Sequence, residues 1–120
     1  MSTLYCNNVA HGIMFHHFHD EKHPRGQGSI SGDDLDRLLK YIGIQRFLSP
    51  AEWLEKLEKN QLQEKEVCLT FDDGLLCQME VALPVLEQYH LQAFWFVYSG
   101  VFEGNLENLE IYRLFRTKFF

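Results

Sequence analysis

Two adjacent carboxylates, Asp72 and Asp73, directly follow the short apolar segment Val67–Phe71 and precede Gly74. The nearly continuous apolar run predicts a strand covered on both faces, as in a parallel sheet. Functional side chains gather at the carboxyl ends of such strands. Because neighbouring carboxylates repel each other, the pair favours a site in which a divalent metal binds one Asp while the other acts as a base. A simple Asp-Asp-Gly turn is the alternative interpretation.

The sequence around the aspartate pair is similar to a known family. Leu69-Thr70-Phe71-Asp72-Asp73-Gly74 resembles the first motif of the NodB-type polysaccharide deacetylases (carbohydrate esterase family 4). Residues 82–97 are similar to the helix, loop and strand that follow this motif, and residues 12–17 resemble the strand that opens many members. The chain, residues 1–120, therefore resembles the amino-terminal part of one incomplete deacetylase domain.

This resemblance implies a distorted (β/α) barrel that hydrolyses the N-acetyl group, sometimes an O-acetyl group, of a sugar residue. It also implies a divalent metal, usually zinc, and an acetylated sugar or glycan as the partner. By their places in the motif, Asp72 would be the general base and Asp73 a metal ligand. His16 matches the family's early histidine, and we expect it to line the substrate pocket together with His17.

The sequence departs from the family where the metal site should be completed. The family supplies a His-Ser/Thr-x-x-His motif after the aspartates, but His90 is the one histidine beyond Asp73 here. A zinc site needs at least three protein ligands, so the site is incomplete in this chain. The second hypothesis is therefore a short, catalytically incomplete homologue that acts as a binding or assembly module. Such a module would cover its open sheet edge by forming a homo-oligomer.

Other chemistries fit the residues less well. A magnesium-dependent phosphoryl-transfer domain also places paired acids at a strand end, but it favours an Asp-x-Asp arrangement and a later phosphate-binding residue. His19 and His23 have the i, i+4 spacing of a metal pair, yet Pro24 follows them and opposes a helix. A solvated polar loop is the favoured interpretation of these histidines. We expect His90, in a helix-to-strand turn, and Trp95, in the core, to be structural.

The spacing of apolar residues, caps and breakers predicts alternating strands and helices, and hence an α/β fold with parallel strands and crossover helices, a partial (β/α) barrel. In the first half of the chain the predicted elements are a strand at 13–15, a loop at 20–31, a helix capped by Ser31 and stopped by Gly43, and a helix from Ser49 that buries Trp53, Leu54 and Leu57. In the second half they are a strand at 67–71, a turn from Leu75 with a helix restarting near Pro84, a strand at 93–98, and a helix within 105–119.

Composition limits the classes of function. With 11 basic and 17 acidic residues the net charge is −6, which argues against nucleic acid or an anionic membrane as a partner. The longest apolar run, residues 93–98, is far shorter than the ~20 residues that span a bilayer. Residues 1–20 lack the pattern of a secretory leader, so we expect a cytoplasmic protein.

The cysteines indicate the cellular compartment, and the length of the chain bears on the size of its core. Cys6, Cys68 and Cys77 are odd in number and have no C-x-x-C spacing, which indicates buried thiols in a reducing compartment. A barrel of the expected kind needs about 250 residues, whereas this chain has 120 and ends on Phe119-Phe120. We therefore expect its ten Phe to form part of a larger core.

Overall fold

The computed structural model describes residues 9–97. Cys6 and the helix predicted within 105–119 lie outside these residues. In chain order the elements are β1 (His11–Phe15), α1 (Gly32–Ile42), the short 3-10 helix η1 (Ile44–Arg46), α2 (Pro50–Glu58), β2 (Val67–Phe71), the π-helical segment η2 (Gln78–Ala82), α3 (Leu83–Gln88) and β3 (Ala93–Trp95).

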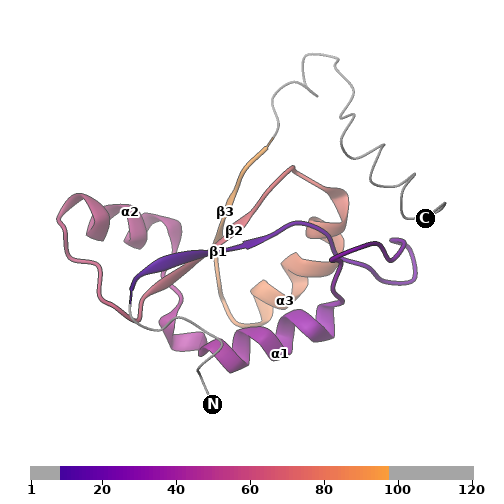
Figure 1. The fold of residues 1–120 in the computed structure, drawn as a ribbon, viewed down its shortest axis with the longest axis horizontal. Coiled ribbons are helices and arrows are strands. Elements are labelled where there is room, and N and C mark those ends of the chain that lie inside the picture. The colour runs from indigo at the N-terminus through magenta and orange to yellow at the C-terminus, as the bar shows by residue number, and fades with distance from the viewer. Residues whose placement is uncertain (1–8, 98–120) are drawn as a thin grey trace.

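The three strands form one open, parallel sheet in the order β1-β2-β3 (Figure 1). This arrangement confirms the predicted parallel α/β fold with helices in the crossovers. The register pairs Phe15 of β1 with Phe71 of β2, and Phe71 with Trp95 of β3. Because β1 and β2 end at paired residues, the segments that follow them leave the sheet side by side.

Helix α1 forms as its sequence predicts. The Ser31 hydroxyl accepts a hydrogen bond from the Asp34 amide, and the Asp34 carboxylate accepts one from the Ser31 amide, so the two residues form a capping box. Leu35 and Leu39, one turn apart, are fully buried. The helix ends at Gly43, whose φ of +113° is a conformation that favours glycine.

The core lies between the sheet and the helices α1 and α3, which lie on the same side of the sheet in Figure 1. Its centre is an aromatic cluster around Phe71. The ring of Phe71 stacks on Trp95 at 4.4 Å between centroids, on Phe15 at 5.5 Å and on Phe18 at 5.9 Å. Trp95 therefore packs in the core, as predicted, and the cluster holds the carboxyl ends of all three strands together.

The predicted burial of α2 is wrong. The helix forms with the expected Ser49 cap, but Leu54 and Leu57 are 49% and 55% exposed, and Trp53 is only half-buried. Figure 1 shows α2 apart from α1 and α3. The apolar stripe is present, but none of the described elements packs over it.

The helix after β2 also differs from the prediction. Instead of a turn and a restart near Pro84, the chain is helical from residue 76 to residue 88 and includes the π-helical segment η2. Pro84 lacks an N–H and its ring would collide with the preceding turn of a regular α-helix. The wider turn of η2 ends at Ala82, two residues before Pro84, and lets the helix continue without a break.

Strand β3 is shorter than the predicted 93–98. It ends at Trp95, although the Phe96 amide still donates a hydrogen bond to the Phe71 carbonyl at 2.8 Å. Strand β2 turns away after Phe71, so Phe96 and Val97 have no further ladder to join. Residue 98 lies outside the described range.

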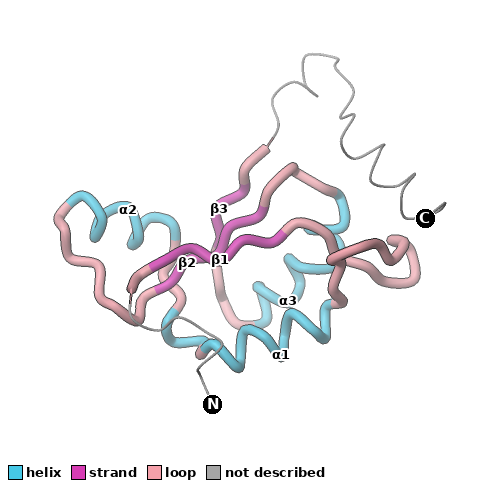
Figure 2. Tube along the Cα trace, in the orientation of Figure 1, coloured by secondary structure: helices cyan, strands magenta, loops and turns pink. Residues whose placement is uncertain are grey.

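A long segment without helix or strand, residues 16–31, joins β1 to α1 (Figure 2). A bridge joins Phe18 and Ile30 near its two ends, and the whole segment contains four of the six histidines of the chain. Within residues 9–97, no helix is both long enough and apolar enough to cross a membrane.

Candidate functional site

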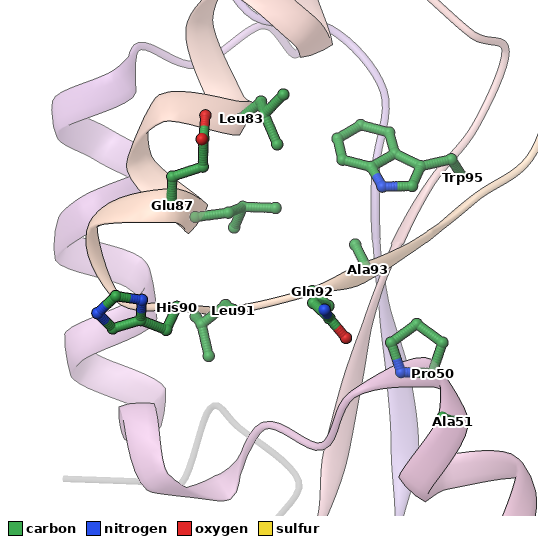
Figure 3. Close-up of a pocket in the computed structure, with 10 residues that line it drawn as sticks. Pro50, Ala51, Leu83, Glu87, His90, Leu91, Gln92, Ala93 and Trp95 are labelled. Atoms are coloured by element: carbon green, nitrogen blue, oxygen red, sulfur yellow. The ribbon is translucent and has the colours of Figure 1, made fainter.

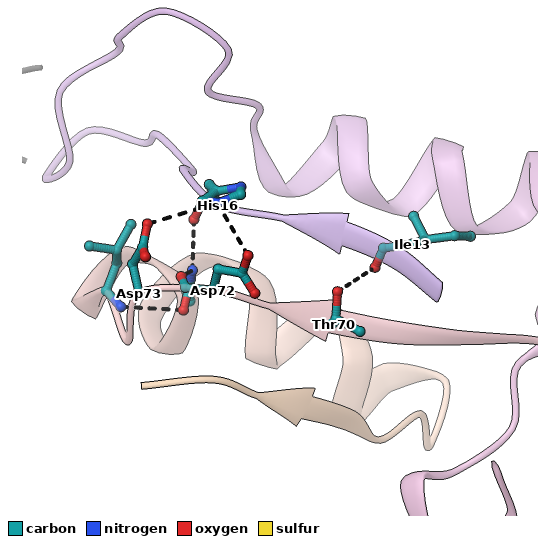
Figure 4. A network of polar contacts seen from close by, with 7 residues as sticks. Ile13, His16, Thr70, Asp72 and Asp73 are labelled. Carbon is teal, nitrogen blue, oxygen red and sulfur yellow. Dashed lines mark hydrogen bonds and ion pairs between the residues drawn. The ribbon is translucent and has the colours of Figure 1, made fainter. Parts of the chain in front are cut away.

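His16 and the two aspartates come together at the carboxyl ends of β1 and β2. The Nε2 atom of His16 lies 3.4 Å from Oδ2 of Asp72 and 3.8 Å from Oδ2 of Asp73 (Figure 4). The three side chains are 39%, 28% and 30% exposed, respectively. They are held by the fold and yet open to solvent, as a site for a soluble ligand requires.

The strand register explains why these residues meet. His16 follows Phe15 and Asp72 follows Phe71, and these two phenylalanines are partners in the β1–β2 ladder. The Asp72 amide donates a hydrogen bond to the Phe15 carbonyl at 3.1 Å, which continues the pairing one step beyond the strands. The parallel sheet thus places two distant sequence segments at one edge.

The turn after β2 has an unusual backbone. Asp73 has φ of +78° and Gly74 has φ of +58°, so two consecutive residues are left-handed. Glycine adopts this conformation without cost, but a residue with a side chain rarely does, and aspartate is among the few that tolerate it. Such strain concentrates at functional sites, where the surroundings hold the backbone in place. The left-handed conformation of Asp73 directs its carboxylate toward His16.

His17 lies beside the site, and its ring stacks on that of His16 with 6.4 Å between centroids. The other loop histidines have protein partners. Nδ1 of His19 lies 2.8 Å from the Ser29 hydroxyl, and Nε2 of His23 lies 2.7 Å from Oε1 of Glu80. These contacts agree with the predicted polar loop.

The described donors provide only part of a metal site. Among residues 9–97 there is no group of three or more His, Cys, Asp or Glu side chains arranged to hold a metal ion. The Asp73 carboxylate is a chemically suitable single ligand, but zinc needs at least three from the protein. Residues 9–97 alone therefore do not fit a complete metal site.

The site contains one residue that the sequence reasoning missed, Gln78. It is 1% exposed, and its Nε2 donates hydrogen bonds to the main-chain carbonyls of His16 at 2.8 Å and Asp72 at 2.5 Å. Gln78 lies at i, i+3, i+4 spacing with the buried Val81 and Ala82. A polar residue in the apolar stripe of a helix is the signal that points to it.

The cysteines of the described part do not contribute a reactive thiol. Cys68 and Cys77 are both buried. Burial raises the pKa of the Cys68 thiol, which keeps it protonated near neutral pH. The Cys77 sulfur accepts a hydrogen bond from the Phe18 amide at 3.4 Å. Both are structural, as the sequence predicted.

A separate pocket of about 890 Å³ lies away from these residues, beside β3 (Figure 3). Its walls come from the start of α2, from α3, and from the turn and strand that follow; they include Leu83, Glu87, His90 and Trp95. His90 lies in the turn after α3, where the sequence places it, and lines this pocket. The pocket contains no cluster of catalytic side chains, so the edge with His16 and the aspartates is the candidate site.

Comparisons with known proteins show which family part of the chain resembles. Residues 59–113, which include the aspartate pair, match the family model described as polysaccharide deacetylase. Over these residues the chain is similar to the polysaccharide deacetylases. No curated protein matches it.

Two solved structures have a similar fold over most of this chain. IcaB from Ammonifex degensii is 28% identical with a TM-score of 0.63, and the match covers 75% of this chain. The Streptococcus pyogenes deacetylase PplD, solved in complex with acetate, is 28% identical with a TM-score of 0.59 over 83% of this chain. This chain spans 38% of the IcaB chain and 46% of the PplD chain.

Proposed function

We propose that this chain contributes the base and the first metal ligand to a carbohydrate deacetylase, which hydrolyses an acetyl group from the nitrogen of an acetylated sugar. The observation that carries this proposal is the approach of His16 to both Asp72 and Asp73 at the carboxyl ends of paired parallel strands. The match of residues 59–113 to the deacetylase family supports it.

Asp72 is the general base in this proposal. Its carboxylate takes a proton from a water molecule as the water oxygen bonds to the acetyl carbon. The carbon–nitrogen bond then breaks, the proton passes to the leaving nitrogen, and acetate and the free amine are the products. His16, 3.4 Å from Asp72, orients the carboxylate toward the water. The 28% exposure of Asp72 leaves room for water and substrate to reach it.

Asp73 would be one ligand of a divalent metal, and zinc is the metal that we propose. Bound zinc lowers the pKa of a coordinated water toward about 7 and polarises a carbonyl. The remaining ligands must come from outside residues 9–97, because the described residues contain no three-ligand group. The left-handed backbone at Asp73 fixes the direction of its carboxylate before any metal arrives.

The test uses the full purified chain with N-acetylated and O-acetylated oligosaccharides, and measures released acetate together with bound metal. Asp72→Asn should lower turnover by about 100- to 10,000-fold and keep the metal. Asp73→Asn should lose both. Asp33→Asn, which alters an exposed carboxylate in α1, is the matched control and should change neither.

The results also separate the two hypotheses. Acetate release that Asp72→Asn leaves intact would overturn the assignment of the base. A wild-type chain that binds the oligosaccharide but releases no acetate would favour the catalytically incomplete binding module.

A further inference from the structure

Gln78 is the one buried polar side chain among residues 9–97, at 1% exposure. It opens η2, the π-helical segment that follows the turn of the aspartates. Burying an amide costs free energy unless its hydrogen bonds are satisfied. The contacts of this side chain therefore show what its burial stabilises.

Every hydrogen-bonding group of the Gln78 amide is used. Its Nε2 donates to the carbonyls of His16 and Asp72, at 2.8 and 2.5 Å, and its Oε1 accepts from the Leu75 amide at 3.3 Å. The two carbonyls belong to the first residues after β1 and β2. One planar amide group thus joins the two segments that present the site.

The sheet itself cannot join these segments. The last hydrogen bond of the β1–β2 pairing runs from the Asp72 amide to the Phe15 carbonyl, and beyond it the two chains diverge. Gln78 adds a further link at this point. The neighbouring Cys77 also contacts the exit of β1, through the Phe18 amide. The start of the helix after β2 therefore holds the exits of both strands.

We infer that Gln78 is a positioning residue, which acts through the backbones of His16 and Asp72 to set the spacing between the imidazole and the carboxylates. This role rests on the proposed function, because it matters for turnover only if Asp72 is the base. At 1% exposure its side chain is not accessible to a substrate. It fixes the distance that the reaction depends on, and a displacement of about 1 Å in such a site can cost about 100-fold in rate.

The test replaces Gln78 by Met, which is similar in length and has no donor, and by Glu, which has the same shape but presents an acceptor to the two carbonyls. We expect both variants to lower kcat by about 10- to 100-fold with KM changed less than about twofold. Leu86→Val, fully buried in the following helix α3 and absent from the site, is the control and should lower stability while leaving kcat unchanged.

A merely structural role makes a different prediction. If Gln78 acts through Asp72, then Gln78→Met should lower the residual rate of Asp72→Asn far less than it lowers the wild-type rate. Equal losses in the two backgrounds, or a loss in Leu86→Val as large as in Gln78→Met, would overturn the positioning role.

A second readout does not depend on activity. In nuclear magnetic resonance spectra of the labelled full chain, the side-chain amide protons of Gln78 should exchange slowly with solvent. The signals of His16 and Asp72 should shift in Gln78→Met and stay in place in Leu86→Val. If the wild type is inactive but these signals behave as expected, the proposed function fails and the positioning of His16 and Asp72 stands. Fast exchange of the Gln78 amide would overturn the inference whatever the activity.

Discussion

Asp73 combines a left-handed backbone with a carboxylate aimed at His16, so the direction of its side chain is set by the turn as well as by rotamer choice. The neighbouring Gly74 is also left-handed, and a Cβ atom there would lie 3.2 Å from Cγ1 of Val97. The φ of Gly74 therefore favours glycine, and an added Cβ would also crowd the exposed side chain of Val97. The carboxylate pair depends on a glycine that carries no chemistry itself.

At this scale we predict that Gly74→Ala lowers the free energy of unfolding by about 1–2 kcal/mol, because alanine is strained in the left-handed region. Urea denaturation followed by circular dichroism measures the change. Gly12→Ala is the control: its Cβ would meet Cys68 and Thr70 at an ordinary 3.5 Å, and its φ is not left-handed. We expect it to change stability by less than about 1 kcal/mol. Equal losses in the two variants would contradict the strain argument.

Among the elements, helix α1 has the most clearly defined stabilising contacts at its two ends. The Ser31–Asp34 capping box satisfies amides at its start, and Gly43 stops it. The carboxylate of Asp34 accepts a hydrogen bond from the Ser31 amide, which with the nearby Arg37 lowers the pKa of that carboxyl below its ordinary 3.8. The helix therefore has one contribution to stability that is independent of pH and one that titrates.

We predict that Ser31→Ala lowers the free energy of unfolding by about 1 kcal/mol, the usual contribution of an N-cap hydroxyl. Chemical denaturation near neutral pH measures it. Ser31→Thr, which keeps a capping hydroxyl at the same position, is the control and should lower stability less than Ser31→Ala. A wild-type midpoint in Ser31→Ala would show that the capping bond contributes nothing.

The charge of Asp34 adds a pH dependence with a definite sign. Since its folded pKa is depressed, its contribution is present above pH 3.8 and is lost as the pH falls through the folded pKa. Asp34→Asn should therefore melt at a lower temperature than the wild type near neutral pH, and the two should converge well below pH 3.8. Thermal melts across this range test the sign, and a gap that widens in acid would contradict it.

Some features of these elements can be predicted from the sequence, and others depend on the rest of the fold. Helix α1 is predictable because caps and apolar spacing are local. The stripe of α2 indicates which face would be buried, but whether a partner covers Leu54 depends on the rest of the fold. Pro84 predicts an irregularity in the helix, but it does not show whether the helix is interrupted or instead contains a wider, π-helical turn. Asp72 and Asp73 stand out through a local motif, whereas the bond from Gln78 to His16 joins residues 62 positions apart.

For the whole molecule, a single apolar layer between the sheet and the helices α1 and α3 carries the stability of the described part. The aromatic cluster around Phe71 lies within this layer and directly beneath the residues of the site. Two leucines, each in the apolar stripe of its helix, have different environments. Leu39 of α1 is fully buried, whereas Leu54 of α2 is 49% exposed.

We predict that Leu39→Ala lowers the free energy of unfolding by about 2–5 kcal/mol, through lost burial and the cavity left behind. Leu54→Ala, the same chemical change on an exposed face, should cost less than about 0.5 kcal/mol. Parallel urea titrations of the two variants give the comparison. A large loss in Leu54→Ala would mean that its face is covered in solution.

The pairing of β1 with β2 has a consequence for how the chain folds. Strand β2, α3 and β3 follow one another closely, whereas α1, η1 and α2 all intervene between β1 and β2. Closing the longer loop costs more chain entropy, so we expect β1 to dock last and to detach first. His16 arrives with β1, and both aspartates are already in place on β2. We therefore expect the candidate site to form only when β1 docks, and a brief opening of β1 to separate His16 from the aspartates while most of the core survives.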